Sequence, residues 1–440
     1  MRTRLPLVAS AIPVLGLVLG LVLGTGVAGA QSMATSGAAP SAGTLGDGIS
    51  LGSSLVLHLG IGAELRYDSN VFFESANTTQ GLALRLTPHF TLGSRPVGQK
   101  VLFRMGAGLD YREWLVSSTG QRPPRQLNAD ASVGVTILPT GPVTTELYDN
   151  FIRSSQMQYQ VSTTNYDRDI NELGIRLRIK PGGGRLELDL SYAFGVDFWE
   201  NRAQQLFDNY YHHTNVRLLY KFLPKTSVYL MADNIVYQYQ RTATPAEAAQ
   251  RPDGYPLRVV AGLNGLLTAK LTFDLYGGYV NGFYKTGPSP STGTAGLTLT
   301  WRPLALTGVA LAYRHDAENT LLGVYANLDN VSVALSQQIW RFTGYLRLAY
   351  QNTRYFGITP ATGIVKLNGA PTTTRTDNSF ALNARVDFFT YHNWLALSVG
   401  YDFTLLRSDT TIGGGVGSSG PIVPVSFDKH EVYLGLSLRY

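Results

Sequence analysis

Apolar and polar residues alternate with a period of two along the chain, from residue 54 to the C-terminus. In the segment 54–68 every second position from Leu55 to Tyr67 is apolar, whereas the positions between them include Glu64 and Arg66. Successive side chains of a β-strand point to opposite faces, so this pattern predicts a strand with one apolar and one polar face.

Eighteen segments with this alternation follow one another along the chain. Each is long enough for a tilted strand to cross the apolar layer of a membrane. The weakest is 143–153, because Asp149 falls on its apolar side. The predicted strands are 54–68, 80–92, 101–114, 127–138, 143–153, 167–180, 185–198, 210–223, 227–239, 255–268, 271–284, 294–302, 307–316, 326–338, 341–353, 376–389, 394–406 and 429–440.

The connections between these segments alternate between short turns and longer polar stretches. Pro139-Thr140-Gly141-Pro142 and Pro181-Gly182-Gly183-Gly184 are examples of the short kind, and 354–375 and 407–428 are the longest of the other kind. This alternation is typical of a barrel whose tight turns lie on one side of a membrane and whose loops lie on the other. With an even number of strands, both chain ends are expected on the periplasmic side, where the short turns lie.

A soluble sandwich or propeller also alternates, so the outward faces decide between the fold classes. These faces carry almost no charge, and aromatic residues such as Tyr67, Phe222 and Tyr350 gather near their ends, where interfacial girdles of membrane proteins lie. We therefore expect an all-β fold: a transmembrane antiparallel β-barrel of about 18 strands, with short periplasmic turns and longer extracellular loops.

The N-terminus has the features of an export signal. Arg2 and Arg4 precede an apolar run that ends in the small residues Ala28-Gly29-Ala30. We expect residues 1–30 to be a cleaved signal peptide, with a retained membrane anchor as the alternative. Residues 31–53 would then be a flexible periplasmic lead and 54–440 the barrel, in the outer membrane of a Gram-negative cell.

Composition supports this interpretation and removes several others. The chain has 47 glycines, 25 tyrosines and 18 phenylalanines, which suit many strands and tight turns, and it has no cysteine that could form a disulfide. Its pI of 9.2 would allow nucleic-acid binding, but the lysines are few and the charges are dispersed. We expect no nucleic-acid partner.

The chain shows no arrangement of residues typical of catalysis. Its seven histidines are scattered, and it has no HExxH motif, phosphate-binding glycine loop or nucleophile elbow. We therefore expect no enzyme activity, no cofactor and no metal site.

Charged residues recur on the face that would line the barrel interior. Two interpretations are open: arginines that bind hydroxyl or carboxylate groups of a passing solute, or arginine–carboxylate pairs that only stiffen the wall. The numbers of basic and acidic groups nearly balance, so we expect no strong ion selectivity. The predicted pore-lining residues are Glu64, Arg66, Arg85, Arg104, Asp110, Arg112, Arg176, Arg178, Arg217, Arg258, Arg347 and Arg385.

Aromatic residues on the same face could offer flat surfaces to sugar rings, or could instead pack the wall against loops that fold inward. The long segments 354–375 and 407–428 could likewise close the mouth or be plain surface loops. The predicted sugar-stacking residues are Tyr148, Tyr211, Tyr229, Tyr276, Tyr345 and Trp394.

Three stretches give the chain a resemblance to a family of outer-membrane proteins, β-barrel porin 2. They are the opening strand from Ala63 to Phe72, the turn-centred run from Tyr220 to Val228, and the segment from Leu271 to Tyr284 with its Tyr276-Gly277-Gly278-Tyr279. Members of this family are often associated with polysaccharide production. The resemblance therefore implies export of an exopolysaccharide or capsular polymer across the outer membrane, as the terminal porin of the pathway.

Two alternatives to polysaccharide export remain: a general diffusion porin for small hydrophilic solutes, and a non-conducting structural or adhesive barrel. Expected partners are outer-membrane lipid, the barrel assembly machinery through the C-terminal strand that ends at Tyr440, and a periplasmic partner that would deliver the polymer.

Overall fold

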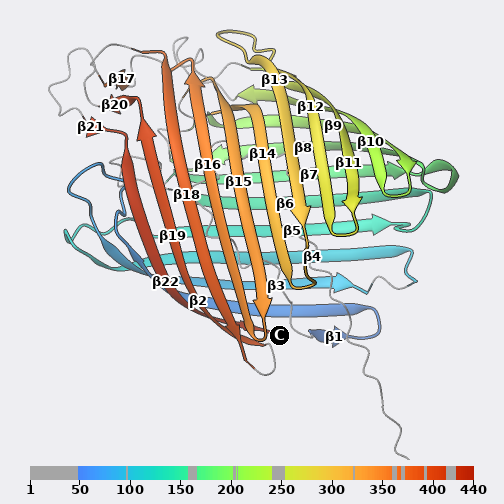
Figure 1. Cartoon of the computed structure of the whole chain (residues 1–440), viewed down its shortest axis with the longest axis horizontal. Coiled ribbons are helices and arrows are strands. Elements are labelled where there is room, and N and C mark those ends of the chain that lie inside the picture. Colours follow the sequence, from blue (N-terminus) through green and yellow to red (C-terminus); the bar gives the residue numbers. More distant parts are fainter. Residues whose placement is uncertain are drawn as a thin grey trace, which may run out of the picture.

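The computed structural model describes residues 48–95, 98–156, 166–201, 205, 207–239, 253–320, 323–358, 364–367, 372–390, 394–412 and 423–440. Within these residues eighteen long strands form one antiparallel sheet that closes on itself (Figure 1). The predicted signal peptide 1–30 lies outside the described residues.

The barrel strands are β2 (Leu55–Asp68), β3 (Gly81–Ser94), β4 (Val101–Ser117), β5 (Gln126–Ile137), β6 (Val143–Gln156), β7 (Tyr166–Ile179), β8 (Leu186–Trp199), β9 (Asn209–Leu223), β10 (Thr226–Tyr239), β11 (Leu257–Thr268), β12 (Leu271–Asn281), β13 (Ser291–Trp301), β14 (Thr307–Asn319), β15 (Tyr325–Ile339), β16 (Phe342–Phe356), β18 (Thr374–Phe389), β19 (Leu395–Ser408) and β22 (Phe427–Arg439).

The first and last barrel strands close the sheet. β22 pairs with β2 from Arg439 opposite Gly60 to Glu431 opposite Asp68, and the backbone N–H of Tyr440 donates to the carbonyl oxygen of Leu59 at 2.8 Å. Lipid offers no hydrogen-bond partners, so a sheet can cross a membrane only when closure satisfies the backbone groups of its edges. The predicted fold is confirmed.

Each of the eighteen predicted strands is present, and only the ends differ. β13 starts at Ser291, three residues earlier than predicted, and β4 continues to Ser117. Asp149, the polar residue that weakened the prediction of β6, accepts a hydrogen bond at 2.9 Å from Nδ2 of Asn171 on β7. This neighbour explains how an acidic residue is accommodated on the outward face of the strand.

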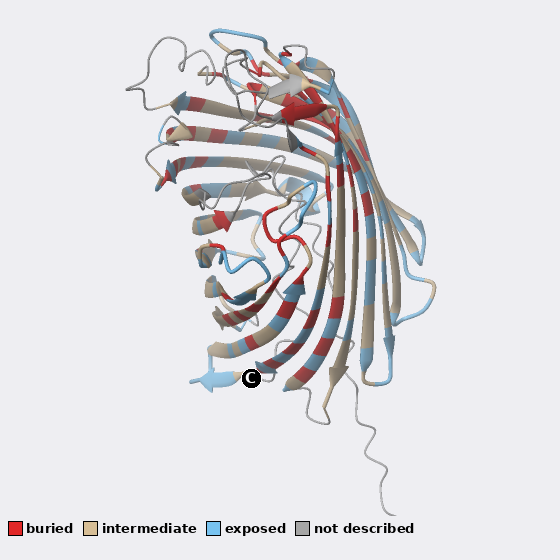
Figure 2. Cartoon of the chain, turned by 90° about the vertical axis from the view of Figure 1, so that its left-hand side faces the viewer, coloured by how far each residue is buried: buried red, intermediate tan, exposed pale blue. Residues whose placement is uncertain are grey.

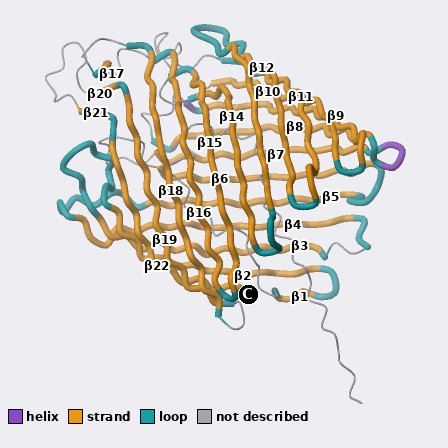
Figure 3. Tube along the Cα trace, in the orientation of Figure 1, coloured by secondary structure: helices purple, strands orange, loops and turns teal. Residues whose placement is uncertain are grey.

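The two ends of the barrel differ in their connections, as predicted (Figure 3). At the end that carries the C-terminus, β9 and β10 are joined by residues 224–225, and β11 and β12 by 269–270. The turn after β7 contains a short 3-10 helix, η1 (Pro181–Gly183), followed by Gly184 with a φ of 81°. The opposite end carries longer connections, and we refer to it as the extracellular end. None of the helices within the described ranges is long and apolar enough to span a membrane.

Short strands extend the barrel at both ends. β1 (Ile49–Leu51) pairs with the start of β2, so the predicted periplasmic lead 31–53 ends in a strand. At the extracellular end, β17 (Ile364–Lys366), β20 (Thr410–Ile412) and β21 (Val423–Pro424) form a three-stranded sheet from the two longest loops. The predicted lid or surface loops therefore pair with each other at the rim, while Gly413 to Gly415 lie outside the described residues.

The outer surface of the barrel is apolar. Buried and exposed residues alternate along the strands (Figure 2), and the exposed positions include Val399, Leu434 and Leu436. Aromatic side chains border this surface near the turn end, where the rings of Phe342 and Phe388 lie 5.0 Å apart. Such a surface is stable against hydrocarbon and would be unfavourable in water.

Outward tyrosines border the same apolar surface toward the extracellular end. Each places its hydroxyl within hydrogen-bond distance of a polar side chain on a neighbouring strand, at 2.8 to 3.0 Å. Tyrosine suits a membrane interface, because its ring is apolar and its hydroxyl is polar. We call this set the tyrosine row; its members and their partners are Tyr192 with His212, Tyr313 with Asp329, Tyr350 with Asn378, and Tyr401 with His430.

Candidate functional site

The predicted pore-lining residues all lie on the inner face of the barrel. Arg347 on β16 shows the pattern: its neighbours Leu346 and Leu348 are exposed on the outer face, so the guanidinium side chain points into the lumen. The same alternation on their own strands places Glu64, Arg66, Arg85, Arg104, Asp110, Arg112, Arg176, Arg178, Arg217, Arg258 and Arg385 on this face. Their contact with a solute stays a prediction.

The most densely paired part of the wall lies on β2, β3 and β4. Arg66 is buried and contacts Glu64 at 3.2 Å and Asp402 at 3.1 Å. Arg85 contacts Glu64 at 3.1 Å and Asp110 at 2.7 Å. Each guanidinium thus has at least two carboxylate partners, which offset the cost of removing the charges from water.

The same network continues onto β22. Glu431 lies 3.5 Å from Arg66 and 3.6 Å from Arg112, and the guanidinium carbon of Arg66 lies 4.3 Å from the ring centroid of Tyr433. Lys429 pairs with the fully buried Asp68 at 2.6 Å. The network therefore crosses the seam where the first and last strands meet.

A second network lies on the strands from β9 to β14. Asp316 accepts from both Arg258 and Arg314 at 2.7 Å, and Asp233 contacts Nε2 of His213 at 2.8 Å. Arg258 also lies 3.7 Å from Asp233, which joins the two acids through one guanidinium. Charged groups thus stiffen this side of the wall as well.

Charged groups nearer the turn end are more open to water. Arg104 and Arg176 share Glu146 at 3.3 and 2.9 Å, and the side chain of Arg104 is 71% exposed. Arg178 contacts Glu187 at 3.1 Å and Asp189 at 2.7 Å. Exposed pairs of this kind contribute little to stability.

The remaining predicted arginines differ in their pairing. Arg385 pairs with Asp387 at 2.7 Å, and Arg217 lies over the ring of Tyr229 at 4.5 Å. Arg347 has no carboxylate within 4.0 Å among the described residues. Arg347 thus differs from Arg66 and Arg85, whose charges are paired with carboxylates.

Most of the predicted sugar-stacking tyrosines lie flat against a glycine on the next strand. Tyr229 is directly opposite Gly262, where an added Cβ would stand 2.2 Å from Cζ of the ring. Tyr211 has the same relation to Gly195, with a separation of 2.0 Å. Each ring therefore occupies space that only glycine leaves free. Further pairs of this kind are Tyr148 with Gly174, Tyr276 with Gly296, and Tyr433 with Gly400.

Burial limits what these tyrosines can offer a ligand. Tyr211 is 2% exposed and Tyr229 is 6% exposed. The hydroxyl of Tyr229 donates to Asp274 at 3.0 Å, and that of Tyr211 donates to Glu172 at 3.3 Å. These rings pack within the wall itself, against glycines of neighbouring strands. Sugar stacking, and the alternative of packing against inward-folding loops, stay predictions.

Tyr345 and Trp394 are the more accessible members of the predicted aromatic set. Tyr345 is 38% exposed on the inner face of β16, directly opposite Arg385. Trp394 is 47% exposed and lies in the turn before β19, at the periplasmic mouth. The six aromatic residues therefore do not form one continuous exposed track.

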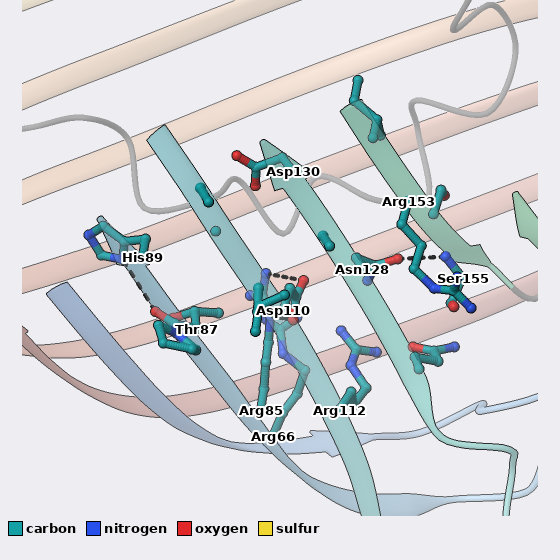
Figure 4. A pocket seen from close by; sticks show the side chains of 18 of the residues that line it. Arg66, Arg85, Thr87, His89, Asp110, Arg112, Asn128, Asp130, Arg153 and Ser155 are labelled. Carbon is teal, nitrogen blue, oxygen red and sulfur yellow. Dashed lines mark hydrogen bonds and ion pairs between the residues drawn. The ribbon is translucent and has the colours of Figure 1, made fainter. Parts of the chain in front are cut away.

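A cavity of about 540 Å³ lies inside the barrel against β2 to β6 and β22 (Figure 4). Arg66, Arg85, Asp110 and Arg112 line it, and Figure 4 shows Arg85 bonded to Asp110 at its wall. Val71 and Phe73, which come from the loop 69–80, also line the cavity. A loop at the extracellular end therefore folds into the lumen.

Asn70 anchors the loop 69–80. Its side chain is fully buried, and Nδ2 donates to the carbonyl oxygens of Glu74 and Asp428 at 2.8 and 3.0 Å. Beyond it, the ring of Phe73 packs edge-on against Phe427 at 5.1 Å. The alternation of the sequence stops at residue 68, so it contains no signal for this inward fold.

The acidic and histidine side chains of the barrel are spread out along the strands. In the described parts of the chain no three His, Asp or Glu side chains are grouped so that they could hold a metal ion. His213, on the inner face, contacts two acids, Asp233 at 2.8 Å and Glu172 at 3.9 Å, within the second network.

Comparison with known proteins shows similarity in fold but not in sequence. No protein-family model matches the chain, and no curated protein matches it. OccK5 (OpdH) of Pseudomonas aeruginosa is 11% identical over 87% of this chain and 98% of that one, with a TM-score of 0.43. OpdK of the same organism is 9% identical over 87% and 99%, with a TM-score of 0.46. The FrpB iron transporter of Neisseria meningitidis is 7% identical over 89% and 82%, with a TM-score of 0.45.

The strand register and the distribution of apolar and charged residues identify the fold class of the chain without these similarities. Its sheet is closed, its exterior is apolar and bordered by aromatic residues, and its interior is charged. Hydrocarbon outside and water inside are the surroundings that this distribution requires. The chain is therefore an eighteen-stranded transmembrane β-barrel of the outer-membrane type.

Proposed function

We propose that the barrel is a passive channel for small polar solutes. The observation that carries this proposal is the width of the closed sheet: side chains fill the interior of an eight-stranded barrel, whereas sixteen to eighteen strands leave an aqueous space. The wall of this space carries charged groups on β2 to β4, on β7 and on β9 to β11, and threonine and glycine on the inner face of β13.

The loop 69–80 restricts the channel near the extracellular end. It brings Val71 and Phe73 to the cavity that Arg112 and Asp130 also line. A solute of this channel must pass beside the loop, so we expect an upper limit on solute size. Because most lumen cations have acidic partners, we expect only weak preference for anions or cations.

Export of a polysaccharide is the second candidate, and it rests on the family resemblance of the sequence. The buried positions of Tyr211 and Tyr229 give it less support, since a polymer would need a continuous series of accessible rings or hydrogen-bonding groups. The small-solute channel needs no such series. The export role, the family and a periplasmic delivery partner therefore remain predictions.

Reconstitution of the purified protein tests the channel directly. In planar bilayers we expect stepwise conductance, and in liposomes we expect swelling rates that fall as the sugar in the bath becomes larger. A barrel that neither conducts nor permits swelling, even without residues 69–80, would rule out the channel. A deletion strain that loses surface polysaccharide but still synthesises it would instead favour export.

A further inference from the structure

Outward-facing charges near the extracellular rim are mostly neutralised by a neighbour. Nδ1 of His315 contacts Asp329 at 2.7 Å, and Nε of Arg125 contacts Glu113 at 2.9 Å. Such pairing lowers the cost of placing charged groups beside the lipid. An outward charge without a partner in this region therefore requires an explanation.

Arg354 on β16 and Arg407 on β19 are two such charges. Arg354 follows the outward series of Leu348 and Tyr350, and Arg407 follows that of Val399. Both side chains are exposed, and neither has a carboxylate within 4.0 Å among the described residues. The two strands lie on either side of β18 (Figure 1).

The groups between the two arginines are arranged to donate hydrogen bonds. Asn352, Asn378 and Arg407 lie directly opposite one another across β16, β18 and β19. Oδ1 of Asn378 accepts from the Tyr350 hydroxyl and from Nδ2 of Asn352, both at 2.8 Å. The Nδ2 group of Asn378 therefore remains available as a donor.

The guanidinium of Arg407 is held in place by the backbone. Its Nη1 donates to the carbonyl oxygens of Leu406 at 3.0 Å and Phe427 at 3.1 Å. The remaining N–H groups are free to bind another acceptor, at a reduced entropic cost because the side chain is already fixed. Two acids lie on neighbouring positions: Asp428 on β22 lies 3.9 Å from Nε2 of His430, and Asp409 pairs with Lys366.

The position of Arg354, Asn378 and Arg407 relative to the membrane indicates which ligand they bind. Tyr350 belongs to the tyrosine row, and Asn378 lies two residues beyond Phe380 toward the extracellular end. Beneath the polar group, Phe380 and Phe403 form an apolar surface with ring centroids 6.3 Å apart. Donors thus lie at the level of lipid headgroups, with a surface for acyl chains directly below.

We propose that Arg354, Arg407 and Asn378 bind the phosphorylated headgroup of a glycolipid of the outer leaflet, whose acyl chains lie against Phe380 and Phe403. Guanidinium groups match phosphate oxygens in charge and in geometry, and often bind them with two parallel hydrogen bonds. This site faces the membrane and is separate from the lumen, so it does not depend on what the channel conducts.

Lipid binding to the purified barrel tests the proposal. Native mass spectrometry of the protein with added lipid A would compare the phosphorylated form with the dephosphorylated form. We expect the wild type to retain the phosphorylated form, and the double variant Arg354→Gln/Arg407→Gln to bind it at least about tenfold more weakly. Both proteins should bind the dephosphorylated form equally weakly.

Arg125→Gln is the matched control, because Arg125 is also exposed at the rim but pairs with Glu113 at 2.9 Å. We expect this variant to bind like the wild type. Resistance of the folded barrel to unfolding in detergent confirms that each variant has folded. Equal binding by the wild type and the double variant, or no preference of the wild type for the phosphorylated lipid, would overturn the proposal.

Discussion

The ring of Tyr229 on β10 lies directly across Gly262 on β11, and the hydroxyl of the same tyrosine donates to Asp274 on β12 at 3.0 Å. One side chain thereby links three adjacent strands on the inner face of the barrel. The glycine is required for close approach of the ring, since an added Cβ would overlap it. The pair shows how the lumen wall gains packing without an apolar core.

Replacing Gly262 should weaken the barrel. In Gly262→Ala the new methyl group would displace the Tyr229 ring toward the lumen and strain its bond to Asp274, at a cost of about 1–3 kcal/mol. The free energy of unfolding in urea from lipid vesicles would measure this loss.

Gly277→Ala is the control for this substitution. Gly277 lies on the adjacent strand β12, and an added Cβ there would have no neighbour within 4 Å. We expect its stability to stay within about 0.5 kcal/mol of the wild type. Equal losses in both variants would show that the ring and its glycine are not a stabilising pair.

Removing Arg66 should destabilise the seam between β2 and β22. The variant Arg66→Ala leaves Glu64, Asp402 and Glu431 without their shared cation, and loss of one partner from a buried ion network costs about 3–5 kcal/mol. The free energy of unfolding in urea from lipid vesicles measures this loss as well. Arg104→Ala, which removes an exposed guanidinium with one partner, should cost less than about 1 kcal/mol. The account of the buried network fails if the two variants lose the same amount.

The sequence predicts the barrel well because the period of two persists through each strand. The lipid and the lumen impose opposite preferences on neighbouring residues, so Leu346, Arg347 and Leu348 already reveal the two faces. Strand ends are less certain, since Ser291-Thr292-Gly293 at the start of β13 do not alternate.

The details of the site could not be predicted in the same way. Tyr229 and Gly262 are 33 residues apart, and only the register between their strands places them together. The pairing of β17 with β20 and the inward fold of the loop 69–80 depend on contacts between distant segments, such as Asn70 with Asp428. Local patterns carry no information about such contacts.

Releasing the loop 69–80 should widen the channel. Asn70→Ala removes the bonds from Nδ2 to the carbonyl oxygens of Glu74 and Asp428, and with them the contact that holds the loop to β22. We expect larger or more variable single-channel currents than in the wild type. Asn234→Ala, which also removes an amide bonded to loop carbonyls but lies on the outward face of β10, should conduct normally. Unchanged currents in Asn70→Ala would mean that the loop does not restrict the pore.

The different solvents on the two faces of one strand can be measured directly, because the chain has no cysteine of its own. Arg347→Cys and Leu348→Cys place single thiols on adjacent residues of β16, and a charged, membrane-impermeant thiol reagent is added to each protein in bilayers. We predict that Arg347→Cys reacts quickly and changes its current, whereas Leu348→Cys does not react. Equal reaction of the two thiols would contradict a barrel with lipid outside and water within.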